Sequence, residues 1–502
     1  MMRRLRTLPL YLMVLSLFVI SCEDNDDNNS TPAIPGGSGS VELVQTQNEF
    51  VWRGLNLYYF WQQDTPNLAD SRFNTLDEFY TFLNTYDDPE TMFNEAPLRN
   101  QDDRFTFFNE DYRVLANAQQ GVFKTNGLSF VLTRVTSGSS EIVGVVRYVN
   151  NNTDASSKDV ARGDIFSAVN GTPLFFNSSE DNNLDLLDPD TYTLNFATIE
   201  NGSAVSNGKN IEFTKVEQDI NPILITKTFD IGGKSIGYLM YNRFTSNFDD
   251  ELNTAFASLA GVDELILDMR YNPGGSVRSS VRLASMITGQ FTGQLMLRQR
   301  YNDKLQEAFS EAQVTDNFVD NISGTSLNSL GLEKVYVIAT DDTASASELV
   351  INGLRAYIDV IHVGTTTVGK NEFSITLVDD VDNQYIFDRT NTSGIAEGNL
   401  WAIQPLLGRN ENADGFSDYT GGFSPNVTSE EALTNLGILG DENEPLLATA
   451  LAQITGATIK GIRFVKDPIK PIMSSDHMTI LKDDMYIDGD KIKDAMLEIK
   501  EN

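Results

Sequence analysis

The sequence predicts a multidomain α/β protein, with a helical N-terminal region and a β-rich region before a core that has a largely parallel sheet. Three observations support this prediction. At 502 residues the chain is too long for one ordinary hydrophobic core. Its hydrophobic pattern changes from helical spacing to short strands, and then to alternating strands and helices. Hydrophobic residues make up 40% of the chain, which is enough for packed globular domains.

The charge balance and the cysteine content exclude several classes of function. Asp and Glu number 71 against 37 Lys and Arg, which gives a formal net charge of −34. Such a polyanion repels phosphate backbones, so we expect no nucleic acid partner. Cys22 is the single cysteine, which excludes disulfides within the chain and cysteine-based zinc sites.

Residues 1–21 have the pattern of a signal peptide. Three arginines precede an apolar run that is too short to span a bilayer comfortably. The following "VISC" resembles the lipobox of bacterial lipoproteins, in which the cysteine is lipidated and becomes the first residue of the mature chain. The resemblance implies a membrane anchor at Cys22. The alternative is an ordinary signal peptide with an incidental cysteine.

Residues 22–40 are acidic and rich in Pro, Gly and Ser, which is typical of a flexible tether. Acidic residues directly after the cysteine also resemble the surface-export signal of some Gram-negative lipoproteins. That resemblance implies an outer-membrane lipoprotein displayed on the cell surface, with a periplasm-facing anchor as the alternative.

Residues 41–120 favour helices. The segments "ELVQTQNEFVWRGLNLYYFWQ" (42–62) and "TLDEFYTFLNTY" (75–86) repeat apolar residues at spacings of three and four. Thr75 stands at the N-cap position of the second segment. We interpret the aromatic side chains of this region as core packing.

Residues 121–222 favour short strands and turns. "GLSFVLTRV" (127–135) and "EIVGVVRYV" (141–149) are typical strands, and "RGDIFSAVNGTPL" (162–174) is a strand with an Asn-Gly turn. This Gly-Leu-x-Phe segment and the later "RGDIFSAVNG" together resemble a PDZ domain. The resemblance implies that a peptide adds a strand here while backbone amides hold its terminal carboxylate. The amides would be those of Gly127, Leu128, Ser129 and Phe130. An unrelated small β-domain is the alternative.

Residues 223–455 alternate between strands and helices. The expected strands are 234–244, 264–270, 334–340 and 360–369, and the expected helices are 248–261, 277–289 and 346–358. This alternation predicts α/β layers around a largely parallel sheet, whose sites lie at the carboxyl ends of the strands. Residues 456–502 form a polar, lysine-rich extension with weak periodicity, to which we assign no role.

Ser345 is the candidate nucleophile. It lies where the expected strand 334–340 passes into the expected helix 346–358, so its hydroxyl and the Ala346 amide face an electropositive helix start. Ser345 and Glu348 also match a helix capping box, which by itself has a structural explanation.

Lys370 is the candidate base. It ends the expected strand that contains His362, 25 residues after Ser345, and it follows a glycine in an uncharged stretch. A lysine that burial keeps neutral accepts a proton from a serine hydroxyl. The alternative is a solvated lysine at a strand end. We expect His362 to be a packed strand residue.

The segment "LDMRYNPGGS" (267–276) contributes a third element. A Gly-Gly turn after a buried strand exposes backbone N–H groups, as an oxyanion site requires. Gly274 or Gly275, together with Ala346, could bind the negative charge that develops on a carbonyl oxygen. A simple tight turn is the alternative.

The order of these segments resembles the carboxy-terminal processing (tail-specific) serine proteases over about residues 45 to 455. "TASASE" followed by "VGK" is the most specific part, and "GFSPNV" and "LGDENEPLLATALAQI" add support. The resemblance implies a ClpP/crotonase-like core with Ser345 as nucleophile and Lys370 as base. It places the oxyanion amides at Gly274, Gly275 and Ala346, and implies no metal or organic cofactor.

One position departs from the family pattern. Many members have glutamine four residues after the lysine, whereas this chain has Ser374 there and the acidic Glu372 nearby. We expect Ser374 and Glu348 to support the two reactive residues. Because a serine side chain is shorter than glutamine, we expect activity to be weaker, conditional or lost.

These features predict a lipid-anchored serine endopeptidase that cleaves unfolded or C-terminal regions of polypeptides. The alternatives are a catalytically inactive surface lipoprotein that binds peptide or another polymer with the same fold, and a glycan-binding lipoprotein.

Overall fold

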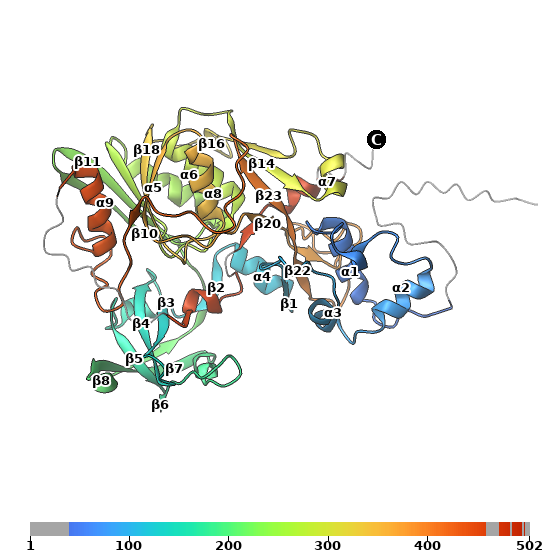
Figure 1. Cartoon of the computed structure of the whole chain (residues 1–502), viewed down its shortest axis with the longest axis horizontal. Coiled ribbons are helices and arrows are strands. Elements are labelled where there is room, and N and C mark those ends of the chain that lie inside the picture. Colours follow the sequence, from blue (N-terminus) through green and yellow to red (C-terminus); the bar gives the residue numbers. More distant parts are fainter. Residues whose placement is uncertain (1–39, 458–470, 482–483, 494–495, 497–502) are drawn as a thin grey trace, which may run out of the picture.

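The computed structural model describes residues 40–457, 471–481, 484–493 and 496 (Figure 1). The expected signal peptide (1–21), the lipidation site Cys22 and all but the last residue of the tether (22–40) lie outside these residues. In the part of the chain that is described, no helix is long and apolar enough to cross a membrane.

The N-terminal region is helical and contains an aromatic core. Its helices are α1 (Asn48–Tyr58), α2 (Leu76–Leu83), α3 (Pro89–Glu95) and α4 (Tyr112–Gln119). The Thr75 side chain accepts the Glu78 N–H at the start of α2, as the N-cap pattern predicted. Trp52 packs edge-on against Phe73 and Phe79, with ring centroids 5.6 and 5.0 Å apart, so the aromatic residues here are core residues.

The β-rich region forms a separate sheet at the lower left of Figure 1. Its strand order is β25-β3-β4-β5-β7-β8, with β6 paired to β5. The strands are β3 (Leu128–Arg134), β4 (Ile142–Val149), β5 (Ile165–Val169), β6 (Thr172–Pro173), β7 (Thr191–Glu200), β8 (Ser203–Thr214) and β25 (Met473–Ser474). A ribbon of β2 (Val122–Thr125) and β9 (Val216–Asp219) joins this region to the core. The edge strand β25 comes from the far C-terminal part of the chain.

The core contains the predicted, largely parallel sheet. Its order is β10-β11-β12-β18-β19-β24, and only the β10–β11 pair is antiparallel. The strands are β10 (Ile223–Ile231), β11 (Lys234–Tyr241), β12 (Glu264–Asp268), β18 (Lys334–Ala339), β19 (Asp359–Gly364) and β24 (Val427–Thr428).

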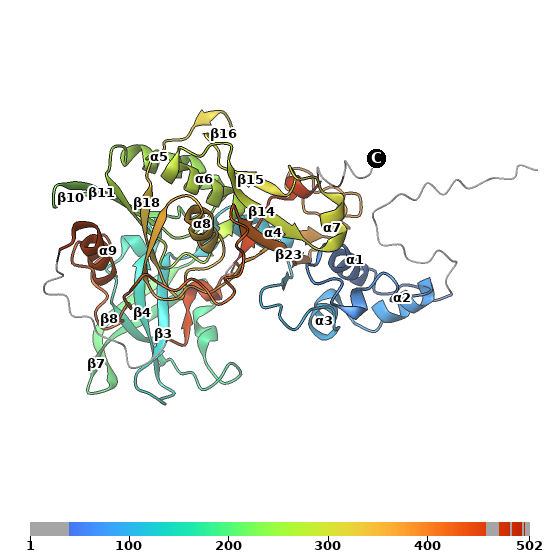
Figure 2. The same cartoon turned by 45° about the horizontal axis from the view of Figure 1, so that its top comes forward.

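Helices cover both faces of this sheet (Figure 2). One face packs against α5 (Asp249–Ser258), α6 (Val277–Thr288) and α8 (Ala346–Arg355), and the other packs against α9 (Pro445–Thr455). Alternate residues of each strand divide between these two hydrophobic clusters because side chains along a strand point to opposite faces.

A second sheet packs beside α5, α6 and α8, and its strand order is β13-β26-β20-β23-β14-β15. The strands are β13 (Gly275–Ser276), β26 (Met485–Tyr486), β20 (Glu372–Ser374), β23 (Leu406–Asn412), β14 (Leu295–Tyr301) and β15 (Thr315–Asn317). Smaller elements are α7 (Asp303–Ala308), β1 (Phe107–Asn109), β16 (Asn321–Ile322), β17 (Thr325–Ser326), β21 (Leu377–Val378) and β22 (Ala402–Gln404).

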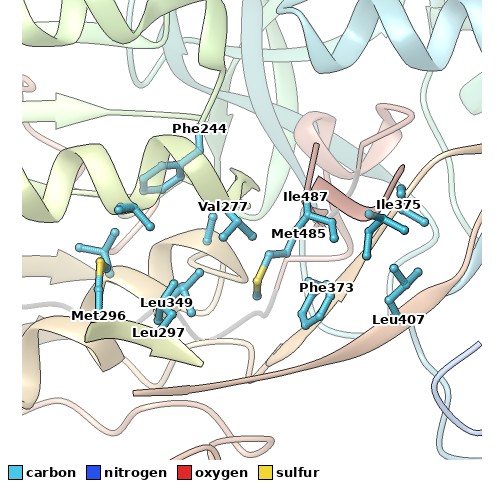
Figure 3. Packing of buried hydrophobic residues seen from close by; sticks show 14 of the residues in the cluster. Phe244, Val277, Met296, Leu297, Leu349, Phe373, Ile375, Leu407, Met485 and Ile487 are labelled. Carbon is cyan, nitrogen blue, oxygen red and sulfur yellow. The ribbon is translucent and has the colours of Figure 1, made fainter. Parts of the chain in front are cut away.

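The C-terminal extension differs from its description as a polar tail. Its strands β25 and β26 belong to two different sheets. Met485 and Ile487 lie between Val277 and Phe373 in the main hydrophobic cluster (Figure 3). The extension is therefore integrated into the folded protein at two separate places.

The structure corrects the position of Lys370. The strand that contains His362 ends at Gly364, and Lys370 lies in the loop before β20. Gly364 has φ 140°, and a Cβ there would come within 1.9 Å of the Ala339 carbonyl oxygen. This close backbone approach requires glycine, and it redirects the chain out of the strand.

Candidate active site

Ser345 occupies a strained position at the N-terminus of α8. Its φ and ψ are 66° and −119°, a conformation that non-glycine residues rarely adopt. The side chain is fully buried, and its hydroxyl has no hydrogen-bond partner among the described residues. Strain and an unpaired buried polar group each cost folding free energy, and such features concentrate at functional sites.

The Asn-Pro-Gly-Gly turn lies directly against Ser345. Gly274 has φ 113°, and a Cβ at this position would lie 2.5 Å from the Ser345 Cβ and 2.9 Å from its Oγ. Gly275 has φ 133°, and a Cβ there would lie 2.1 Å from the Phe244 carbonyl oxygen. Both glycines are therefore required by the backbone conformation and by close approach.

Both glycine amides predicted for the oxyanion site have acceptors in this structure. The Gly274 N–H donates to Asn272 Oδ1 at 2.9 Å, and the Gly275 N–H donates to the Asp484 carbonyl oxygen at 2.7 Å. Ala346, the third predicted donor, is buried as the first residue of α8. Gly274 and Ala346 thus adjoin Ser345 and Gly275 follows Gly274, while the two glycine donors already have partners.

Glu348 links the nucleophile and the lysine through their backbones. Its Oε2 accepts the N–H groups of Ser345 at 2.8 Å and Lys370 at 2.9 Å. Its Oε1 accepts the Thr367 hydroxyl at 2.5 Å and the Gly369 N–H at 2.7 Å. Burial raises the pKa of Glu348 to about 7, against the opposing effect of these donors. The expected capping residue therefore also holds the lysine loop.

The Lys370 side chain is buried beside a carboxylate and an aromatic ring. Its Nζ lies 3.9 Å from Asp484 Oδ1 and 5.0 Å from the Phe105 ring centroid. Since the Ser345 hydroxyl has no partner among the described residues, the Ser345–Lys370 hydrogen bond is not formed in this structure. Catalytic hydrogen bonds are often long without substrate and shorten when substrate binds.

Ser374 and Glu372 take part in different interactions. The Ser374 hydroxyl lies 3.1 Å from Asp484 Oδ1 and 2.9 Å from the Met485 carbonyl oxygen, and it accepts the Gln404 amide at 3.1 Å. Glu372 Oε1 accepts Arg409 Nε at 3.0 Å. The carboxylate nearest to Lys370 in sequence thus pairs with an arginine.

Asp484 is a site residue that the sequence analysis missed. It is fully buried, and burial raises its pKa while the Lys370 ammonium opposes the shift. It lies 114 residues after Lys370 in the C-terminal extension, so spacing within the protease-like segments carried no signal for it.

Ser347 and His362 have separate roles in packing. The Ser347 hydroxyl donates to the Asn272 carbonyl oxygen at 3.1 Å. His362 is buried in β19 with Nε2 3.0 Å from the Ala339 carbonyl oxygen, and burial lowers its pKa. Of the two serines in the motif, Ser345 is the one with an unpaired hydroxyl.

Gly127 directly precedes β3, and Leu128, Ser129 and Phe130 begin this strand. Gly127 has φ 90°, and a Cβ there would come within 2.0 Å of Thr153 Oγ1. The Ser129 hydroxyl donates to Asp476 Oδ2 at 3.0 Å, and the Phe130 N–H donates to the Ser475 hydroxyl at 2.9 Å. The C-terminal extension therefore contacts this segment as well.

A cavity of about 400 Å³ lies between the β-rich region and the core. Leu128 and Phe130 line it from β3, Pro273 lines it beside the Gly-Gly turn, and Asp476 and Thr479 line it from the extension. The cavity thus joins the edge of β3 to the surroundings of Ser345.

Comparisons with known proteins identify the class of protein. The model of the peptidase S41 N-terminal domain matches residues 46–107, and the model of peptidase family S41 matches residues 235–390. The second match contains Ser345, Lys370 and the Gly-Gly turn. The chain therefore belongs to peptidase family S41.

Curated relatives have related names. The chain is 25% identical over 307 residues to the chloroplastic C-terminal processing peptidase of Tetradesmus obliquus, covering 59% of this chain and 60% of the relative. It is 26% identical over 189 residues to the carboxyl-terminal-processing protease of a Synechocystis species, covering 37% and 38%. The matched segments thus span less than two thirds of these relatives.

A solved structure from Bacteroides fragilis, assigned to the S41 proteases, has a related fold. It superposes with a TM-score of 0.59 at 23% identity, covering 85% of this chain and 100% of that chain. This similarity shows that the chain shares the mixed α/β fold of an S41 peptidase.

Proposed function

We propose that this protein is a serine endopeptidase that cleaves unfolded or C-terminal regions of polypeptides, with Ser345 as nucleophile and Lys370 as base. The observation that carries the proposal is the strained, buried and unpartnered Ser345 hydroxyl at the start of α8. The backbone N–H groups of Ser345 and Lys370 both donate to the same oxygen of Glu348.

The proposed reaction proceeds in two steps. Neutral Lys370 accepts the Ser345 proton as Oγ attacks the carbonyl carbon of the peptide bond, and the Ala346 and glycine amides stabilise the oxyanion. The C–N bond breaks, and the leaving amine takes the proton from the Lys370 ammonium. Water then attacks the acyl-enzyme with Lys370 as base, which releases the carboxylic acid and restores Ser345.

The β-rich region is proposed to be a PDZ-like domain that delivers the substrate. Strand addition at β3 would bind an extended peptide, and the segment Gly127–Phe130 would bind its terminal carboxylate. Two features support this assignment: the edge of β3 already pairs with an extended segment, and the adjoining cavity leads towards the Gly-Gly turn.

The membrane anchor is a further part of the proposal and is supported by the sequence pattern before Cys22. We propose a lipoprotein of the outer membrane that faces the cell surface. Metabolic labelling with a fatty acid analogue should modify the parent protein and leave Cys22→Ala unmodified. Labelling of both proteins would contradict the anchor without affecting the proposed chemistry.

Single substitutions test the proposed catalytic pair. We expect Ser345→Ala and Lys370→Ala each to lower cleavage of an unfolded protein substrate by at least about a thousandfold. Ser347→Ala is the matched control, because it removes a neighbouring hydroxyl that bonds elsewhere. Cleavage that persists in both Ser345→Ala and Lys370→Ala would reject the catalytic pair.

A further inference from the structure

The C-terminal extension passes through both places at which the proposed function requires a polypeptide. Its described residues 471–481 lie along the β-rich region, and residues 484–493 lie beside the Gly-Gly turn and β20. The family models match only residues 46–107 and 235–390, so this extension is outside the matched segments.

At the first place, the extension adds a strand to the sheet. β25 pairs antiparallel with β3, with Met473 opposite Leu132 and Ser474 opposite Val131. The Ile472 N–H donates to the Leu132 carbonyl oxygen at 2.8 Å. This is the geometry of peptide recognition by strand addition, so an incoming peptide would compete for the same backbone groups.

The extension also brings a carboxylate to the proposed carboxylate-binding segment. Asp476 is half-buried there, and its Oδ2 accepts the Ser129 hydroxyl at 3.0 Å. Burial raises the pKa of Asp476, and the nearby Arg147 and Arg243 oppose the shift. An aspartate side chain thus supplies, within the chain, the chemical group that a substrate terminus would supply.

At the second place, the extension fills the gap between two strands of the site. β26 runs parallel to β13 on one side and to β20 on the other. The Asp484 carbonyl oxygen accepts the Gly275 N–H. A Cβ added at Gly274 would lie 2.5 Å from this oxygen and 2.5 Å from the Ser345 Cβ, so both atoms lie on the same side of Gly274. A peptide carbonyl therefore already uses an amide that the oxyanion would need.

The Asp484 side chain acts on the proposed base. Its Oδ1 lies 3.9 Å from Lys370 Nζ and 3.1 Å from the Ser374 hydroxyl. A carboxylate at this distance favours the ammonium form of a lysine, and an ammonium group cannot accept the Ser345 proton. The extension thus opposes the reaction in two ways: its carboxylate keeps Lys370 protonated, and its backbone occupies an amide of the oxyanion site.

We propose that the described residues 471–481 and 484–493 are an intramolecular inhibitor that occupies both polypeptide-binding places and holds Lys370 beside Asp484. Release of this segment, by competition with a substrate or by cleavage of the connection to α9, opens the site. The inference rests on the proposed function, because an inhibitor presupposes an activity.

A protease recognition sequence inserted within 458–470 tests release of the segment in the full chain. After cutting, we expect Ser345-dependent proteolysis to rise by about tenfold or more, because cutting removes the high effective concentration of a tethered segment. A synthetic peptide of residues 471–496 should then inhibit competitively. A scrambled insertion exposed to the same protease is the control. Unchanged activity on cutting would overturn the inhibitor.

Two aspartate variants separate the charge effect from loss of packing, because the extension also contributes core residues. Asp484→Asn keeps the backbone contact with Gly275 and removes the charge beside Lys370. We expect proteolysis near neutral pH to rise by about tenfold. The exposed Asp490, on the same extension, gives the control Asp490→Asn, which should match the parent. Equal activity of both variants and the parent would overturn the role of Asp484.

A binding measurement distinguishes failure of the inhibitor from failure of the proposed catalysis. In the Ser345→Ala background, cutting should strengthen binding of a fluorescent unfolded polypeptide by about tenfold or more. Equal binding before and after cutting would overturn the inhibitor even if no variant cleaves substrate. Stronger binding with no proteolysis by any form would support occupancy by the extension and reject the proposed protease activity.

Discussion

Ser345 and Lys370 donate their backbone N–H groups to the same oxygen, Oε2 of Glu348, at 2.8 and 2.9 Å. The carboxylate belongs to the first turn of α8, so one helix start fixes both the strained serine and the loop that carries the lysine. The relative position of the two residues therefore depends on a third side chain that contacts neither reactive atom.

This arrangement predicts a positioning role for Glu348. In Glu348→Gln a single amide oxygen replaces two acceptor oxygens, so at least one of the four donors loses its partner. We expect kcat to fall by about a hundredfold with little change in KM, as for small misplacements of reacting groups. Glu251→Gln, an exposed change on α5, is the control for steady-state kinetics. A change in KM alone would contradict a positioning role.

The raised pKa of Glu348, about 7, predicts a pH dependence of activity. Below this pH the group is protonated, one oxygen becomes a donor, and the four contacts cannot all persist. We expect kcat to decline as the pH falls through about 7. Glu348→Gln should lack this limb of the pH profile. A parent profile that is flat from pH 5 to 8, measured at saturating substrate, would contradict the prediction.

The same group predicts a pH dependence of stability. Its pKa rises from 4.5 in the unfolded chain to about 7 in the folded protein, so the folded state binds more protons between these values. The free energy of unfolding should therefore decrease as pH rises through this window, by about 3 kcal/mol from this group. Denaturant titrations at several pH values should show this slope in the parent, and a reduced slope in Glu348→Gln.

The close approach of Gly274 to Ser345 predicts the effect of adding a methyl group. Gly274→Ala places a Cβ 2.5 Å from both Ser345 Cβ and the Asp484 carbonyl oxygen, at φ 113°. We expect loss of at least about 2 kcal/mol of stability and displacement of the serine. Gly138→Ala is the control: it has φ 80° but no atom within 4 Å of the added Cβ, so it tests backbone strain alone. Equal thermal stability of the two variants would contradict the packing argument.

The contacts of Glu431 at the junction between the β-rich region and the core predict how the stability of this junction depends on acid. Its carboxylate accepts Arg162 at 2.5 Å and Arg270 at 3.1 Å, and the Tyr271 hydroxyl at 2.5 Å. Burial opposes ionisation, yet Arg162 and Arg270 hold the pKa of Glu431 at about 2, below its usual 4.5. This contribution is present above pH 4.5 and is lost as the pH falls through about 2.

We therefore expect Glu431→Gln to lower the free energy of unfolding at pH 7 by about 3 kcal/mol. The difference from the parent should narrow below pH 4.5 as the parent carboxylate becomes protonated. Chemical denaturation at pH 7 and pH 3 measures both values. A difference that is constant across this range would show that the ionised carboxylate does not stabilise the junction.

Many local elements could be predicted from the amino-acid pattern alone. The strands β11, β12 and β18, the start of β19 and the helices α5, α6 and α8 follow from their apolar spacing, and the N-cap at Thr75 follows from its position before a helical repeat. The strands of the second sheet, such as β14 and β23, were not predicted. Ser345 stands at a strand-to-helix junction, as its neighbours predicted. These features depend on periodicity, capping and turn chemistry, which act over a few residues and leave a readable pattern.

The tertiary structure alone decided which distant groups meet. Lys370 lies in a loop because Gly364 allows two backbones to approach closely, a relationship that the strand-like pattern of 360–369 does not reveal. Asp484 reaches Lys370 and Gly275 because a two-residue strand of the extension pairs between β13 and β20. Such contacts form when elements far apart in the sequence pack and pair with each other. Patterns within a few residues do not reveal which distant elements will meet.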